Sequence, residues 1–146
     1  MKTYLLDTNV LIALSWRGHA EHERVSKWFA RQGANGWATC PITQAGFVRI
    51  VSSPAFSRQA ASPQEALQLL KQNLAHPKHK FWPADLDLVE ATKLITDRIV
   101  GHQQVTDAYL LGLAIKKQGT LATLDRGILE LLGARSPQQE NLELLA

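Results

Sequence analysis

Three aspartates stand at places in the sequence where carboxylates can do chemistry. Asp7 directly follows the apolar run 4–6, and Asp125 directly follows the mostly apolar run 121–124. Asp107 stands near the start of the helical segment that precedes the second run. Ligands of open parallel sheets bind outside the carboxyl ends of the strands, so we expect all three side chains at one edge of the sheet.

Each aspartate taken singly has an ordinary structural explanation, because Asp is a favoured N-cap and all three stand at expected helix starts. Three carboxylates at one edge, however, repel each other unless a cation neutralises them. Carboxylate oxygens are the ligands that hard divalent cations prefer, and such a cation can activate water for hydrolysis. The grouping therefore favours a divalent-cation site over three independent helix caps.

The elements that position these carboxylates alternate along the whole chain. The runs expected to be strands cover residues 3–6, 36–39, 79–82, 120–124 and 141–145. The segments expected to be helices cover residues 9–16, 19–31, 41–52, 62–75, 85–101, 106–118 and 125–132. Strands separated by helices are typical of an α/β fold with a parallel sheet and helices on both faces.

Helix boundaries in this pattern carry recognisable signals. Ser62, Pro63 and Glu65 have the spacing of a capping box with proline at the first helical position. We expect Asp85 to cap the helix that runs to residue 101, and Gly119 to form the C-cap of the helix over 106–118.

Length and composition narrow the class of protein. The 146 residues fit one domain spanning 1–146, and 45% hydrophobic with 20% charged residues excludes global disorder. The apolar runs are far shorter than the ~18–20 residues that span a membrane. Asp7 interrupts the apolar run that a secretory signal would need. The lone Cys40 excludes both an internal disulfide and a zinc site built from thiolates. We therefore expect a cytoplasmic protein.

Four motifs in the chain resemble, in order and spacing, those of one known family. They are LLDTN at 5–9, PITQAGFVR at 41–49, TDAYL at 106–110 and LATLDRG at 121–127. Together they resemble the PIN-domain ribonucleases, in particular the VapC toxins of bacterial toxin–antitoxin pairs. The resemblance extends from residue 3 to about residue 132 and so covers nearly the whole chain.

The resemblance implies a fold, an activity and partners. The fold would be a PIN-like three-layer α/β sandwich, with a mostly parallel sheet of four to five strands flanked by helices. The activity would be endonucleolytic hydrolysis of RNA phosphodiester bonds with Mg²⁺, or Mn²⁺, held by Asp7, Asp107 and Asp125. The partners would be the RNA substrate, a cognate VapB-type antitoxin and a second copy of the chain, giving a homodimer and a toxin–antitoxin hetero-oligomer without any membrane.

One position departs from the family pattern. The family's glutamate in the helix after the second strand falls on Gln44, whose amide brings no charge and cannot act as a base. We therefore expect weaker occupancy of a second metal and reduced turnover. The alternative is a degenerate PIN-like binding module that holds RNA or an antitoxin but cleaves poorly. A phosphotransferase with an aspartyl phosphate would want a second acid where Asn9 stands.

Further residues are expected to support the site or to contact RNA. The candidates for hydrogen bonds behind the metal ligands are Thr8, Asn9, Thr106 and Thr123. The candidates for RNA contact are Arg49 and Arg126 for phosphates and Trp16 for stacking on a base. The formal charge of +3 includes the three pocket aspartates, so the rest of the chain carries +6, which suits a phosphate backbone.

Overall fold

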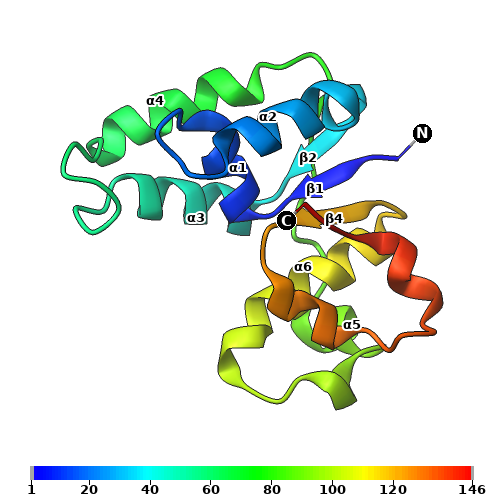
Figure 1. The fold of residues 1–146 in the computed structure, drawn as a ribbon. Helices are drawn as coiled ribbons and strands as arrows, with labels where there is room; N and C mark the ends of the chain where they lie inside the picture. Colours follow the sequence, from blue (N-terminus) through cyan, green and yellow to red (C-terminus); the bar gives the residue numbers. More distant parts are fainter. Residues whose placement is uncertain (1, 146) are drawn as a thin grey trace.

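The computed structural model describes residues 2–145 and is built on a five-stranded parallel sheet (Figure 1). The strands are β1 (Tyr4–Leu6), β2 (Trp37–Thr39), β3 (His79–Phe81), β4 (Thr120–Thr123) and β5 (Leu142–Leu144). Their order is β3-β2-β1-β4-β5, and each neighbouring pair is parallel. The predicted α/β sandwich is therefore confirmed, with five strands that all run in one direction.

Helices cover both faces of the sheet. The α-helices are α1 (Thr8–Ser15), α2 (His22–Arg31), α3 (Pro41–Val51), α4 (Pro63–Leu74), α5 (Leu88–Thr92) and α6 (Val105–Lys116). Figure 1 shows α1 to α4 above the sheet and α5 and α6 below it. Short 3-10 helices complete the structure: η1 (Gly33–Asn35), η2 (Thr96–Arg98), η3 (His102–Gln104), η4 (Arg126–Leu131) and η5 (Pro137–Asn141).

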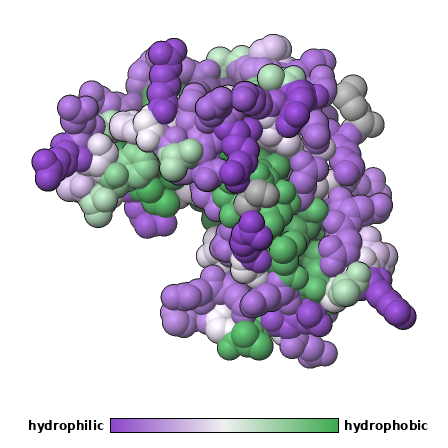
Figure 2. Space-filling view, viewed as in Figure 1, coloured by the Kyte–Doolittle hydropathy of each residue, from purple (hydrophilic) through white to green (hydrophobic). Residues whose placement is uncertain are grey.

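Each face of the sheet has its own hydrophobic core. Because side chains alternate along a strand, Tyr4 and Leu6 of β1 pack into the core with α1 to α4, whereas Leu5 packs into the core with α6. Figure 2 shows a largely hydrophilic face, with apolar side chains gathered between the upper and lower layers. No helix within residues 2–145 is long and apolar enough to cross a membrane.

The expected helix from Asp85 to residue 101 is wrong. The N-cap is Asp87, whose Oδ1 accepts a hydrogen bond from the Glu90 backbone N–H at 2.8 Å, and α5 ends at Thr92. Asp85 instead pairs with Lys117 at 3.5 Å. The hydroxyl of Thr92 donates to the backbone carbonyl one turn earlier, a bond that competes with regular helix geometry, and the chain continues as turns and η2.

Other boundaries differ by a few residues. The helix expected from residue 19 begins at His22, and the segment after Asp125 is the 3-10 helix η4. Helix α6 ends at Lys116, and the left-handed residue after it is Gln118, with φ of 57°, not Gly119. Gly119 is needed for space, because a Cβ there would lie 2.7 Å from the Thr3 carbonyl oxygen. The capping box at the start of α4 forms as predicted.

Candidate functional site

The carboxyl ends of β1 and β4 place two aspartates on neighbouring strands. Asp7 directly follows β1 and caps α1, its Oδ1 accepting from the Thr8 backbone N–H at 2.8 Å. Its own N–H donates to the Ala122 carbonyl of β4 at 3.0 Å, and the residue is only 6% exposed. Asp125 stands two residues after β4 and caps η4, its Oδ1 accepting from the Gly127 N–H at 2.9 Å.

Thr123 joins these two aspartates. Its buried hydroxyl donates to Asp7 Oδ2 at 2.7 Å and accepts from the Asp125 backbone N–H at 3.0 Å. One hydroxyl therefore fixes the orientation of the Asp7 carboxylate and the backbone that carries Asp125. Because Asp7 accepts from both Thr8 and Thr123, rotation of its carboxylate would break a buried hydrogen bond.

Asp107 lies on α6, which packs on the other face of the sheet from α1. It is the third residue of α6, so it does not cap that helix, and it is half-buried. The pKa of its carboxyl is raised to about 7, chiefly by burial and further by the charges of Asp7 and Asp125 and a hydrogen bond with Asp125. The fold therefore brings all three strand-edge aspartates close enough to interact.

The pKa of Asp7 is also raised, by causes that partly oppose one another. Burial is the largest cause, and the charge of Asp125 adds to it. The hydrogen bonds from Thr123 and Thr8 act in the opposite direction, because they stabilise the carboxylate. A cation at this edge would relieve the repulsion that adds to the effect of burial on both pKa values.

The donor chemistry of this cluster fits a hydrated divalent cation. Within residues 2–145, no three His, Cys, Asp or Glu side chains stand as a ready-made cage for one ion. Mg²⁺ does not need such a cage, because it keeps several waters and is bound through one or two carboxylates together with substrate phosphates. Asp7, Asp107 and Asp125 supply hard oxygen donors in an area of unrelieved negative charge.

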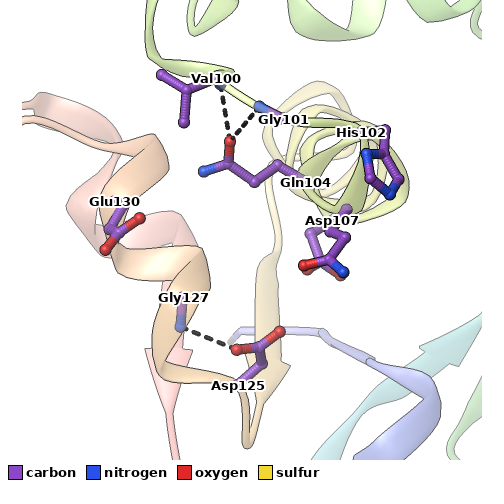
Figure 3. A pocket seen from close by; sticks show the side chains of 9 residues that line it. Val100, Gly101, His102, Gln104, Asp107, Asp125, Gly127 and Glu130 are labelled. Carbon is purple, nitrogen blue, oxygen red and sulfur yellow. Dashed lines mark hydrogen bonds between the residues drawn. The ribbon is translucent and has the colours of Figure 1, made fainter.

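A pocket of about 360 Å³ opens beside the cluster (Figure 3). Asp107 and Asp125 belong to its walls, which are completed by residues of η3, η4 and the segment before η3. The remaining residues are Val100, Gly101, His102, Gln103, Gln104, Gly127 and Glu130. Sequence reasoning missed them, because they lie in 3-10 turns that have no hydrophobic periodicity and do not follow a strand.

The structure places Gln44 in a hydrogen-bonded chain of its own. Its Nε2 donates to Thr39 Oγ1 at 3.0 Å, and that hydroxyl oxygen lies 2.8 Å from His79 Nε2. Between residues 2 and 145, no hydrogen bond joins the Gln44 side chain to the three aspartates. Gly46, two residues further along α3, packs against the first turn of α1, since a Cβ there would lie 2.7 Å from Thr8 Oγ1.

The expected supporting residues differ in how they contact the site. Asn9 Oδ1 accepts from the Leu124 N–H at 3.3 Å and so ties α1 to the turn after β4. Thr8 contributes its backbone N–H to Asp7, while its side chain faces Gly46. Thr106 is exposed on the first turn of α6.

The expected RNA contacts lie outside the walls of this pocket. Arg49 on α3 and Arg126 at the start of η4 are both exposed. Trp16 is not brought to the pocket: its indole packs edge-on against Phe56, with ring centroids 5.1 Å apart, beside the upper core. The Trp16 side chain therefore contributes to packing beside the upper core and is not among the residues that line the pocket.

Comparison with known proteins agrees with this geometry. The family model of the PIN domain matches residues 4–132. Ribonuclease VapC39 of Mycobacterium tuberculosis strain H37Rv is 39% identical over 132 residues, covering 90% of this chain and 95% of that protein. Ribonuclease VapC38 of the same strain is 40% identical over 131 residues, covering 90% and 91%.

The fold also matches solved structures. The crystal structure of DNA-bound VapBC from Salmonella typhimurium superposes with a TM-score of 0.66 and covers 100% of both chains. Its sequence identity of 16% means that this match concerns the fold alone.

Proposed function

Because this chain belongs to the PIN-domain family, we propose that it is a divalent-metal-dependent endoribonuclease and the toxin of a VapBC-type toxin–antitoxin pair. The observation that carries the proposal is the convergence of Asp7, Asp107 and Asp125 from three separate elements on one sheet edge. Relatives about 40% identical over nine-tenths of the chain are named ribonucleases, so the alternative of a non-cleaving binding module is not favoured.

The three aspartates would hold Mg²⁺ or Mn²⁺. Such an ion, when bound, supplies an activated water and stabilises charge on the phosphoryl oxygens. Asp7 is the fixed member, because Thr8 and Thr123 hold its carboxylate in one orientation. Asp107 and Asp125 face the open pocket, where a phosphodiester can approach from solvent.

The surface outside the pocket suits an RNA backbone. Without the three aspartates the chain carries a formal charge of +6, and positive charge steers a polyanion toward the acidic site. Arg49 and Arg126 are exposed and remain our candidates for phosphate contacts. Gln44 on α3 is proposed as an uncharged residue of the site. Because the proposed substrate is RNA, we also propose a cytoplasmic location.

The proposed partners are an antitoxin and a second copy of the chain. The structural neighbours include a toxin–antitoxin complex from Klebsiella pneumoniae and the DNA-bound VapBC of Salmonella typhimurium. A VapB-type antitoxin is accordingly proposed here, together with a homodimer and a toxin–antitoxin hetero-oligomer.

The test is cleavage of total cellular RNA by the purified, antitoxin-free protein with Mg²⁺, with Mn²⁺ or with EDTA. We expect discrete products that require metal and disappear in Asp7→Asn. The matched control is Asp97→Asn, which removes an exposed carboxylate of η2 outside the acidic cluster and should cleave like the parent protein. Products that form equally in EDTA, or equally with Asp7→Asn, would overturn the proposal.

A further inference from the structure

The pocket beside the acidic cluster carries polar groups that metal binding does not use. Gln104 Oε1 accepts from the backbone N–H groups of Val100 and Gly101 at 2.8 and 3.1 Å. Both partners are donors, so the bonded atom must be the amide oxygen, and the orientation of the amide is settled. The amide nitrogen is thereby turned away from the backbone and toward the pocket, as Figure 3 shows, with its two donor hydrogens available.

A carboxylate stands on the facing wall. Glu130 lies in η4 and lines the same pocket as Gln104. Within residues 2–145 its side chain joins none of the salt bridges, so its two oxygens are available as charged acceptors. The wall itself is anchored, because Arg98 Nε donates to the Glu130 backbone carbonyl at 3.0 Å and links η2 to η4.

A donor amide opposite a carboxylate is complementary to one RNA base more than to the others. The pairing edge of guanine presents two neighbouring N–H groups, N1–H and the exocyclic amine, beside the O6 carbonyl. A carboxylate can accept from both N–H groups while an amide donates to the carbonyl, and hydrogen bonds to a charged acceptor are the stronger kind. Adenine, cytosine and uracil each offer only one N–H to a carboxylate on this edge.

We propose that the pocket holds an unpaired guanine of the RNA beside the scissile phosphate, with Gln104 and Glu130 as the residues that determine this specificity. The inference rests on the proposed nuclease function. Single-stranded RNA is commonly recognised through the pairing edges of splayed bases. The volume of about 360 Å³ lies in the ~300–1,000 Å³ range of small-ligand sites. Val100, 86% exposed at the rim, offers an apolar surface to the face of the base.

The location supports a base next to the cut. Asp107 and Asp125 line the same pocket, so a guanine held by Gln104 and Glu130 lies directly beside the proposed metal ligands. The preference should therefore appear at one fixed position adjacent to the cleaved bond.

Two variants separate base recognition from folding. Glu130→Gln keeps the shape of an exposed side chain but removes the charge and one acceptor. Gln104→Glu keeps an oxygen for the Val100 and Gly101 N–H groups but replaces the free donor with an acceptor. Glu140→Gln is the matched control, because Glu140 is an exposed carboxylate of η5 that does not line the pocket.

The experiment is cleavage of a randomised single-stranded RNA pool with Mg²⁺, followed by sequencing of the new ends. A well-placed bidentate pair discriminates between bases by about tenfold or more. We therefore expect about tenfold or greater enrichment of guanine at one position with the parent protein and with Glu140→Gln. We expect the enrichment to fall to about twofold or less in Glu130→Gln and in Gln104→Glu. Enrichment that is absent from the parent, or unchanged in both variants, overturns the inference.

A binding measurement distinguishes failure of this inference from failure of the nuclease proposal. Guanosine and adenosine monophosphates are titrated into the parent and into Glu130→Gln, with binding followed by calorimetry. Tighter binding of the guanosine nucleotide that Glu130→Gln abolishes supports the guanine site even if no RNA is cleaved. Equal binding of the two nucleotides by the parent overturns the site, whatever the result of the cleavage assay.

Discussion

Asp107→Asn is predicted to stabilise the metal-free protein at pH 8. Burial and the neighbouring carboxylates raise the pKa of Asp107 from 3.8 to about 7 in the folded protein. The folded state therefore binds this proton more tightly than the unfolded state. The protonated Asp107 carboxyl contributes its full share of the unfolding free energy below about pH 4, and this contribution is lost as the pH rises through 7. Asparagine has nearly the same shape and no charge, so the variant avoids the cost of ionisation.

The size of the effect follows from the pKa. A rise from 3.8 to about 7 corresponds to about 4 kcal/mol at about 1.4 kcal/mol per pH unit, which is an upper limit. Asp107 is only half-buried, and solvent screening reduces the expected gain in unfolding free energy to about 1–2 kcal/mol. At 2–4 °C per kcal/mol for a domain of about 150 residues, Tm should rise by about 2–8 °C.

The assay is thermal unfolding followed by circular dichroism in EDTA at pH 5 and pH 8. We expect Asp107→Asn to raise Tm at both, with the larger gain at pH 8, whereas Asp97→Asn changes Tm little at either. Added Mg²⁺ should stabilise the parent more than Asp107→Asn, because the variant lacks one of the proposed ligands. A lower Tm for Asp107→Asn at pH 8, or an equal gain at both pH values, would refute the reasoning.

Three further substitutions, one of them with a matched control, test the site and the packing of the helix that carries Asp107. Thr123→Val removes the hydroxyl that holds Asp7, and metal-dependent cleavage should fall by about 10–100-fold while circular dichroism shows a folded protein. Gly112→Ala should lower the unfolding free energy by about 1–3 kcal/mol in urea titrations, because a Cβ there would lie 2.0 Å from a carbonyl oxygen of α5. The control Gly101→Ala should change the unfolding free energy little, because a Cβ at Gly101 would meet open space. Gln44→Glu adds a carboxylate on α3 and should lower the Mg²⁺ concentration for half-maximal cleavage; an unchanged requirement would show that Gln44 serves only its partner threonine.

The acidic cluster was predictable because its cause is local in the sequence. A polar residue just after a buried strand lies at the carboxyl edge of a parallel sheet. Asp7 directly follows β1, and Asp125 stands two residues after the end of β4. The parallel direction of the strands was also predictable from a local pattern, because a helix separates each strand from the next along the chain. Thr123 was a candidate from its place beside Asp125, but its hydrogen bond to Asp7 could not be read from the sequence, because the two residues meet only where β1 pairs with β4.

The start of α5 and the pocket walls in η3 and η4 could not be predicted from local pattern. Asp85 and Asp87 are both good N-caps, and only the ion pair of Asp85 with Lys117 and the hydrogen bond of Asp87 to the α5 backbone separate them. Gln104 and Glu130 stand in 3-10 turns whose positions depend on tertiary contacts such as that of Arg98 with the η4 backbone.

The most direct test of the central claim measures Mn²⁺ binding and RNA cleavage on the same metal-free samples. Binding is followed by loss of the free-ion electron paramagnetic resonance signal, and the samples are the parent, Asp7→Asn, Asp107→Asn and the control Asp97→Asn. If the three aspartates form the metal site that cleaves RNA, the parent and the control bind Mn²⁺ and cleave, and Asp7→Asn and Asp107→Asn lose both properties together. Cleavage that persists in variants unable to bind Mn²⁺, or Mn²⁺ binding unaffected by either aspartate substitution, would contradict the account.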